Sequence, residues 1–206
     1  MIWRLNRLNA VHKPLMNFCN KLTLSRLIMA LIMTACLSLP VPFGKTLALI
    51  FFLLAALTDY WDGWLARNVY GTTVFGKLMD PLADKILVCS AFICFTALDQ
   101  IVPAFITVII IAREFMVTGL RLLAAGQGQI ISAERWGKHK TIWQIIVIAA
   151  IMLGLALRDE ILPWLMDTRQ MPEHINTVFN YWFHYAAITA VGLVAVLTVV
   201  SGSIYF

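Results

Sequence analysis

The sequence predicts an all-α integral membrane protein with six transmembrane helices and an N-terminal amphipathic helix at the membrane interface. Of its 206 residues, 61% are hydrophobic and only 13% are charged, whereas soluble domains average about 45–50% apolar and about 25% charged residues. The mean hydropathy is +0.82. Six long apolar stretches and a one-sided distribution of Lys and Arg complete the pattern. This composition indicates that lipid is the solvent.

The six apolar stretches are each long enough, at 1.5 Å per helical residue, to cross a hydrocarbon core about 30 Å thick. They cover residues 22–40, 46–67, 73–98, 102–125, 140–157 and 181–201. Pro, Gly and polar residues separate them, and the widest break is expected over 158–180. We therefore predict one six-helix domain over residues 21–206.

The N-terminal segment, residues 1–20, differs from the six stretches. It interleaves apolar residues with Arg4, Arg7 and Lys13. This pattern is typical of a short helix that lies in the interface rather than one that crosses the bilayer.

The distribution of Lys and Arg predicts the orientation. If the N-terminus and the second and fourth loops share one side, that side holds 13 of the 16 basic residues, and only Lys45, Arg158 and Arg169 lie opposite. Basic residues favour the cytoplasmic side. We therefore expect a multi-pass protein of a bacterial-type inner (cytoplasmic) membrane with both termini in the cytoplasm. The net charge of +5 favours anionic headgroups or phosphorylated substrates as partners rather than nucleic acid.

Four aspartates lie in apolar surroundings, where a carboxylate is costly. Asp59 and Asp62 are three residues apart near the end of the second stretch, and Asp80 and Asp84 are four apart near the start of the third. These spacings put each pair on one helix face. The short connection between the stretches predicts antiparallel neighbours, which would bring both pairs together at the cytoplasmic side.

Converging carboxylates need cations, and hard divalent ions such as Mg2+ or Mn2+ prefer oxygen ligands. Two such ions are suited to clamping a phosphoryl group. The small residues Gly63, Ala66 and Gly76 would let the helices or a ligand approach closely, and Arg67 is suited to phosphate. A purely structural ion network with nearby basic residues is the alternative interpretation.

The complete pattern Asp59-x2-Asp62-Gly63-x2-Ala66-Arg67-x8-Gly76-x3-Asp80-x3-Asp84 resembles the signature of the CDP-alcohol phosphotransferase family. The resemblance implies a six-helix fold with a cytoplasmic active site. It also implies two divalent metal ions and transfer of a phosphatidyl or related group from a CDP-linked donor with release of CMP.

The roles that the resemblance implies follow the matched positions. Asp59, Asp62 and Asp80 are implied to bind metal, and Asp84 to act both as a metal ligand and as the general base. The implied CDP-binding residues are Asp62, Gly63, Ala66, Arg67 and Gly76.

The acceptor alcohol is predicted from the rest of the chain. Arg113, Arg121, Lys138 and Lys140 favour an acceptor that carries its own phosphate. The motifs "LTLSR" (22–26), "AREFMVTGLRLLAAGQG" (112–128) and "GKHKT" (137–141) resemble the phosphatidylglycerophosphate synthase branch of the family. That resemblance implies CDP-diacylglycerol as donor and sn-glycerol 3-phosphate as acceptor, and the family resemblance supports a homodimer.

Three alternatives within the same chemistry use another acceptor: inositol phosphate, serine, or phosphatidylglycerol as in cardiolipin synthase. A cation transporter or channel is the alternative from a different class. It predicts carboxylates spread through the depth of the membrane, whereas the four aspartates cluster at one end of their helices.

Overall fold

A computed structural model describes residues 18–65, 74–98, 101–127, 135–166 and 173–203. Within these ranges the chain forms only helices and their connections. The elements are α1 (Phe18–Ser38), α2 (Gly44–Leu65), α3 (Val74–Ala97), α4 (Ala104–Gly126), α5 (Arg135–Ala156), the π-helical turn η3 (Leu157–Ile161), the short α6 (Leu162–Leu165) and α7 (Glu173–Ser203). The all-α prediction with six long helices is confirmed, while the interfacial helix predicted for residues 1–20 falls almost entirely outside the described residues.

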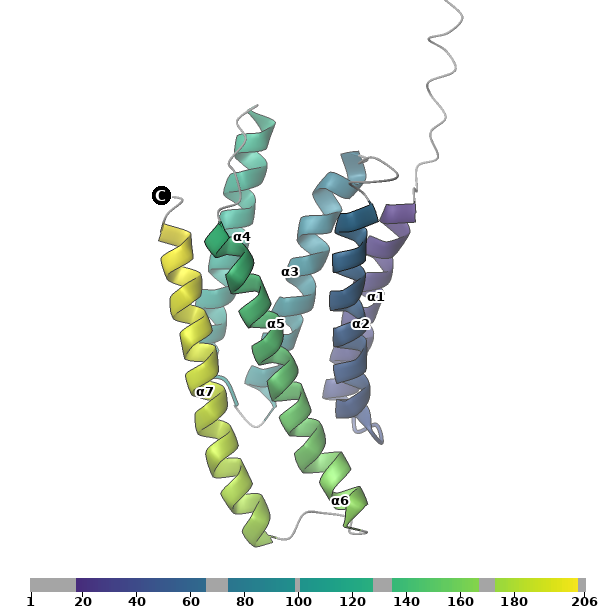
Figure 1. The fold of residues 1–206 in the computed structure, drawn as a ribbon, viewed down its shortest axis with the longest axis vertical. Coiled ribbons are helices and arrows are strands. Elements are labelled where there is room, and N and C mark those ends of the chain that lie inside the picture. The colour runs from purple at the N-terminus through teal and green to yellow at the C-terminus, as the bar shows by residue number, and fades with distance from the viewer. Residues whose placement is uncertain (1–17, 66–73, 99–100, 128–134, 167–172, 204–206) are drawn as a thin grey trace, which may run out of the picture.

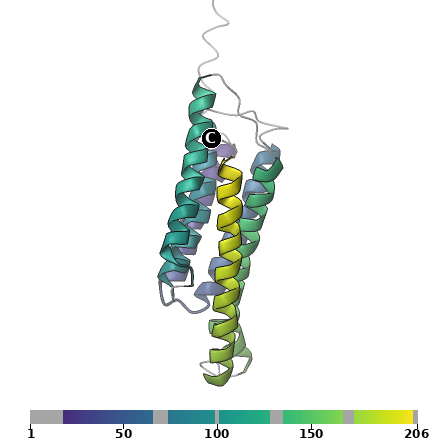
Figure 2. The same cartoon turned by 90° about the vertical axis from the view of Figure 1, so that its left-hand side faces the viewer.

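The six long helices alternate in direction and form a ring (Figure 1). α1 packs on α2 and α3, α2 on α5, α5 on α7, α7 on α4, and α4 on α3. Figure 2 shows α7 lying between α4 and α5. α2 and α3 are antiparallel as predicted, but their described residues touch at few points because α1 packs along both.

Apolar side chains from all six long helices fill the inside of the ring, including Met33 of α1. Phe52, Phe92, Phe95, Ile110, Ile148, Met152 and Val191 are all completely buried. The rings of Phe92 and Phe95 meet edge to face with centroids 6.3 Å apart, a favoured aromatic geometry. The core therefore holds the described parts of the helices in one body.

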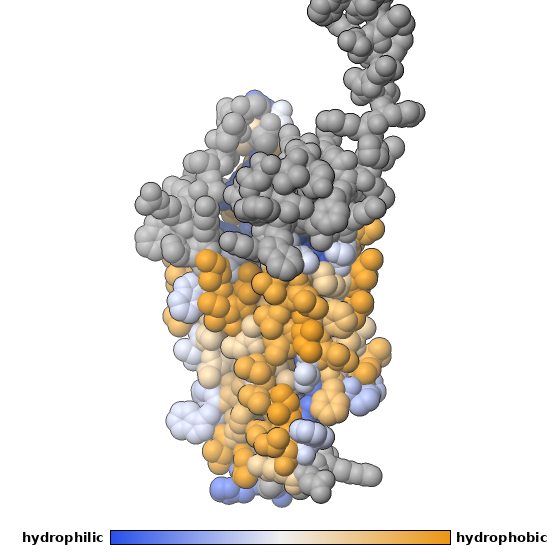
Figure 3. Space-filling view, turned by 45° about the vertical axis from the view of Figure 1, so that its right-hand side comes forward, coloured by the Kyte–Doolittle hydropathy of each residue, from blue (hydrophilic) through white to orange (hydrophobic). Residues whose placement is uncertain are grey.

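Large apolar side chains also cover the outside of the ring. Phe105, Leu123 and Leu193 are 66%, 67% and 62% exposed, and Figure 3 shows a broad apolar band with hydrophilic side chains gathered at its lower end. An exposed apolar surface of this extent is unfavourable in water. The band is the surface expected of a protein that contacts lipid.

One helix in the described ranges, Glu173–Gly202, is long and apolar enough by itself to span a membrane. Shorter apolar helices cover Thr23–Ser38, Gly44–Thr58 and Lys85–Ala97. These lengths count only the described residues, and the helices α2 and α3 both continue into the segment that carries the aspartates.

The wide break predicted over 158–180 is wrong. The helix continues from α5 through η3 and α6 to Leu165, and α7 already begins at Glu173. The polar side chains in this part of the helices are hydrogen-bonded to one another. The guanidinium group of Arg158 donates to the carboxylate of Asp159 at 2.8 Å and to the side-chain oxygen of Asn180 on α7 at 3.1 Å. Pro163 in the first turn of α6 lacks an N–H donor, which is consistent with a π turn just before it.

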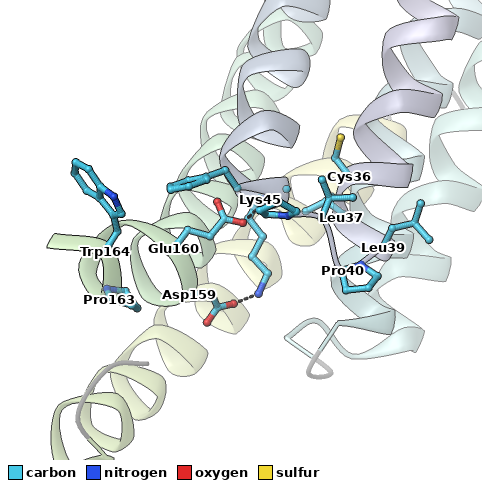
Figure 4. Close-up of a pocket in the computed structure, with 13 residues that line it drawn as sticks. Cys36, Leu37, Leu39, Pro40, Lys45, Asp159, Glu160, Pro163 and Trp164 are labelled. Carbon is cyan, nitrogen blue, oxygen red and sulfur yellow. Dashed lines mark hydrogen bonds and ion pairs between the residues drawn. The ribbon is translucent and has the colours of Figure 1, made fainter. Parts of the chain in front are cut away.

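The start of α2 is capped by a residue from η3. The backbone N–H groups of Lys45 and Thr46 donate to the two carboxylate oxygens of Glu160 at 2.7 and 2.9 Å, and the Thr46 hydroxyl donates at 2.6 Å. Lys45 also forms an ion pair with Asp159 (Figure 4). The first N–H groups of a helix have no partner within it, so Glu160 satisfies two of them and ties α2 to η3.

We predict that Glu160→Ala lowers the thermal stability of the detergent-solubilised protein by about 1–2 kcal/mol, because two helix N–H groups lose a carboxylate partner. Glu160→Gln, which keeps one good acceptor oxygen, should lose less. Thermal unfolding followed by size-exclusion chromatography measures both. Glu173→Gln removes the same charge from an exposed position and serves as control; equal stability of all four proteins would contradict the capping role.

Candidate active site at the aspartate end of the bundle

The four aspartates lie at the same end of the bundle. Asp59 and Asp62 belong to the last turns of α2, and Asp80 and Asp84 to the first turns of α3. Because the two helices are antiparallel, the end of α2 and the start of α3 lie together at the upper end of Figure 1. Asp59 precedes the end of α2 by six residues, or about 9 Å along the axis. The backbone thus brings both pairs to similar depth.

The contacts of the aspartate side chains themselves lie outside the described part of the molecule. The same holds for the side chains of Lys77, Lys138 and His139, while Ala66 and Arg67 fall in the undescribed range 66–73. Among the side chains that the structure does describe, no group of three or more His, Cys, Asp or Glu residues could hold a metal ion. The metal-ligand and CDP-binding assignments therefore stay predictions.

A buried carboxylate on α4 gathers the basic residues near this end. Glu114 is 2% exposed and forms ion pairs with Lys85 from α3 at 2.9 Å, with Lys140 from α5, and with the neighbouring Arg113 at 3.5 Å. Gln144 also points toward it, with its Nε2 atom 3.4 Å from Oε1. One acidic side chain thus connects α3, α4 and α5.

This cluster lies at the depth of the aspartates. Lys85 directly follows Asp84 in α3, so the two residues differ by about 1.5 Å along the helix axis. Lys140 lies near the beginning of α5 and is only 5% exposed. Burying a charge without a partner is very unfavourable, which explains why Glu114 is found where the lysines converge.

The C-terminal helix holds Arg113. The guanidinium Nη2 atom donates to the Ser201 hydroxyl at 2.7 Å, and that hydroxyl donates to the carbonyl oxygen of Thr198 at 3.1 Å. A Cβ atom at Gly202 would lie 3.0 Å from Arg113 Nε and 3.3 Å from its Cγ. The absence of a side chain at Gly202 therefore allows Arg113 to lie against α7.

The structure brings together two of the four predicted acceptor-phosphate residues, Arg113 and Lys140, through Glu114. Arg121 is half-buried on α4, eight residues or about 12 Å further along the axis. Lys138 lies in the first turn of α5. Whether these residues bind phosphate stays a prediction.

Sequence reasoning did not assign Lys85, Gln144, Ser201 or Gly202 to the site. Two signals in the sequence point to the first two: Lys85 adjoins Asp84, and Gln144 is four residues after Lys140 and so shares its helix face. Arg26 is a charged residue within an apolar stretch of the sequence. The structure buries it on α1, where it is 1% exposed. No local signal marks Ser201 and Gly202, whose contact with Arg113 depends on how α7 packs.

Two of the cavities bounded by described residues at the opposite end of the bundle contain polar side chains. One, of about 410 Å³, is lined by the α1–α2 connection together with Asp159, Glu160 and Trp164 (Figure 4). The other, of about 750 Å³, lies between Arg158 and the first half of α7. No predicted site residue lines either cavity, so neither cavity belongs to the predicted active site.

Comparison with known proteins agrees with the motif. Residues 16–193 match the model of the family described as CDP-alcohol phosphatidyltransferase. The chain is 40% identical over 149 residues to the CDP-diacylglycerol–glycerol-3-phosphate 3-phosphatidyltransferase of Bacillus subtilis, covering 66% of this chain and 77% of the relative.

Proteins of the same name show similar identities. The one from Rickettsia felis is 32% identical over 140 residues, which cover 67% of this chain and 76% of the relative. The one from Mycoplasma pneumoniae is 40% identical over 139 residues, which cover 64% and 60%. The matched range and these identities show that the chain belongs to the CDP-alcohol phosphatidyltransferase family, whose members are membrane enzymes that use divalent metals.

Proposed function

We propose that this protein transfers the phosphatidyl group of CDP-diacylglycerol to sn-glycerol 3-phosphate, forming phosphatidylglycerophosphate and releasing CMP. The observation that carries the proposal is the 40% identity to the Bacillus subtilis 3-phosphatidyltransferase over 149 residues, a stretch longer than the whole aspartate motif. Basic residues of α3, α4 and α5 gathered around Glu114 support an acceptor that carries a phosphate.

All six long helices cross the membrane in this proposal, with the aspartate end at the cytoplasmic side. The apolar outer band and the alternating helix directions support six crossings. Basic residues concentrated at the aspartate end support the orientation. A homodimer and an interfacial helix over residues 1–20 belong to the same proposal.

The four aspartates fit a pair of divalent cations by their chemistry, since they offer only oxygen ligands and their helices bring them to one depth. Asp59, Asp62, Asp80 and Asp84 would hold the ions, which would offset the charge of the donor pyrophosphate and stabilise CMP as leaving group. Gly63, Ala66, Arg67 and Gly76, together with Asp62, would bind the CDP part of the donor.

The chain's own residues then orient the acceptor and take its proton. Asp84 accepts the proton of the 1-hydroxyl of glycerol 3-phosphate as that oxygen attacks the phosphorus linked to diacylglycerol. A new oxygen–phosphorus bond forms, the bond to the pyrophosphate bridging oxygen breaks, and CMP departs with that oxygen. Arg113, Arg121, Lys138 and Lys140 would hold the acceptor phosphate, which keeps the 1-hydroxyl near Asp84.

An acceptor panel tests the substrate assignment. Purified protein in mixed micelles with CDP-diacylglycerol and a divalent cation should release CMP with glycerol 3-phosphate, because the basic cluster favours a phosphorylated alcohol. Serine should give less than about a tenth of that rate because it carries no phosphate, and inositol phosphate and phosphatidylglycerol should do the same because the similar relatives are named for glycerol 3-phosphate. CMP release measures every arm, and faster release with one of the other alcohols would overturn the acceptor assignment.

Removal of divalent cations should abolish turnover. Thorough chelation followed by desalting is expected to reduce CMP release to background, because the donor pyrophosphate then faces uncompensated carboxylates. Adding back Mg2+ or Mn2+ should restore the rate, while Na+ at equal ionic strength should not. Full activity of the chelated protein would contradict metal dependence.

Asp84→Asn should lower turnover by at least about 100-fold, because an amide cannot accept the acceptor proton and is a weaker metal ligand. CMP release per folded molecule measures the effect. Asp159→Asn, which makes the same change at the opposite end of the bundle, provides the matched control and should keep its turnover. Normal turnover of Asp84→Asn would rule out the general-base role.

A further inference from the structure

We propose that Glu114 is a positioning residue of the acceptor site: it holds Lys85 and Lys140 at the depth of Asp84, where both bind the phosphate of the acceptor alcohol. The inference rests on the proposed function and adds Lys85, which no motif assigned, to the acceptor site. Its basis is the pair of contacts that one carboxylate makes to lysines from two different helices.

The two lysines bind different oxygens of the same carboxylate. Lys140 is paired with Oε1 and Lys85 with Oε2 of Glu114. Two ammonium groups repel each other, more strongly in a buried site than in water, so the carboxylate between them determines how closely they approach. Glu114 thus brings α3 and α5 into register at this depth.

Contact with Glu114 is compatible with binding a phosphate. An ammonium group donates up to three hydrogen bonds, so one lysine can contact a carboxylate and a phosphate at the same time. Lys85 is 16% exposed and Lys140 5%, and Lys85 directly follows the proposed general base Asp84. A phosphate bound by both would lie at the depth of the residue that is proposed to take the acceptor's proton.

The other groups around Glu114 favour the same role. Arg113 Nη1 is 3.5 Å from Oε1, but its Nη2 is turned to Ser201 on α7. Gln144, one turn after Lys140 on α5, has its Nε2 3.4 Å from Oε1. Contacts to residues of α3, α4 and α5 therefore hold Glu114 in place, and its two lysines come from the helices on either side of α4 in the sequence.

Steady-state kinetics of the full-length protein in mixed micelles test the inference. For Glu114→Gln we expect the KM for glycerol 3-phosphate to rise at least tenfold, while kcat changes less than threefold and the KM for CDP-diacylglycerol stays unchanged. A purely structural role would lower the melting temperature and the active fraction, which reduces kcat and leaves KM alone. Glu173→Gln removes the same charge far from the cluster and should leave both constants unchanged.

A double-mutant cycle shows whether Glu114 acts through its lysines. Lys140→Met and Lys85→Met should each raise the KM for glycerol 3-phosphate, and Glu114→Gln combined with Lys140→Met should raise it by less than the product of the single effects. Should Glu114→Gln not fold, Lys85→Met and Glu114→Asp replace it. Glu114→Asp keeps the charge and should give a smaller rise in KM.

The outcomes separate this inference from the proposed function. Wild-type protein that transfers only to alcohols without a phosphate would overturn the acceptor assignment and, with it, the inference. Wild-type protein active on glycerol 3-phosphate, with unchanged KM in Lys85→Met or with multiplicative effects in the cycle, would overturn the inference alone.

Discussion

A charged side chain placed in hydrocarbon must find its partner within the protein, because lipid supplies neither counter-ions nor hydrogen bonds. Glu114 shows the consequence most directly. Its carboxylate is 2% exposed and is surrounded by basic groups from three helices. Removing one member of such a buried group leaves another charge without compensation, so the packing of α3, α4 and α5 depends on the cluster being complete.

The two ends of the bundle use charge differently. At the end opposite to the aspartates, Glu160 and Asp159 are occupied by the first turn of α2 and by Lys45, and Arg158 links η3 to α7. These contacts join helix ends to one another. At the aspartate end, Asp59, Asp62, Asp80 and Asp84 lie within α2 and α3, and their predicted role is to bind metal ions.

Most of the helix pattern could be read from the sequence because apolar runs of membrane length have few alternatives to a helix. The prediction of a break over 158–180 is wrong, because the polar residues there do not end the helices. Arg158, Asp159 and Asn180 form contacts with one another across η3 and α7, so the helices continue beyond their apolar parts. Hydropathy predicts which residues contact lipid. The length of a helix also depends on polar contacts with neighbouring residues and helices, which hydropathy does not describe.

The sequence by itself determined the family and the spacing of the four aspartates, since both depend on residues within about one helical hairpin of one another. It also pointed to the basic residues of α4 and α5. Only the tertiary structure decided which of them meet: Glu114 with Lys140, 26 residues apart, and Arg113 with Ser201, 88 residues apart. Those contacts depend on the order of helices around the ring, in which α7 lies between α4 and α5, and that order is a property of packing rather than of any local pattern.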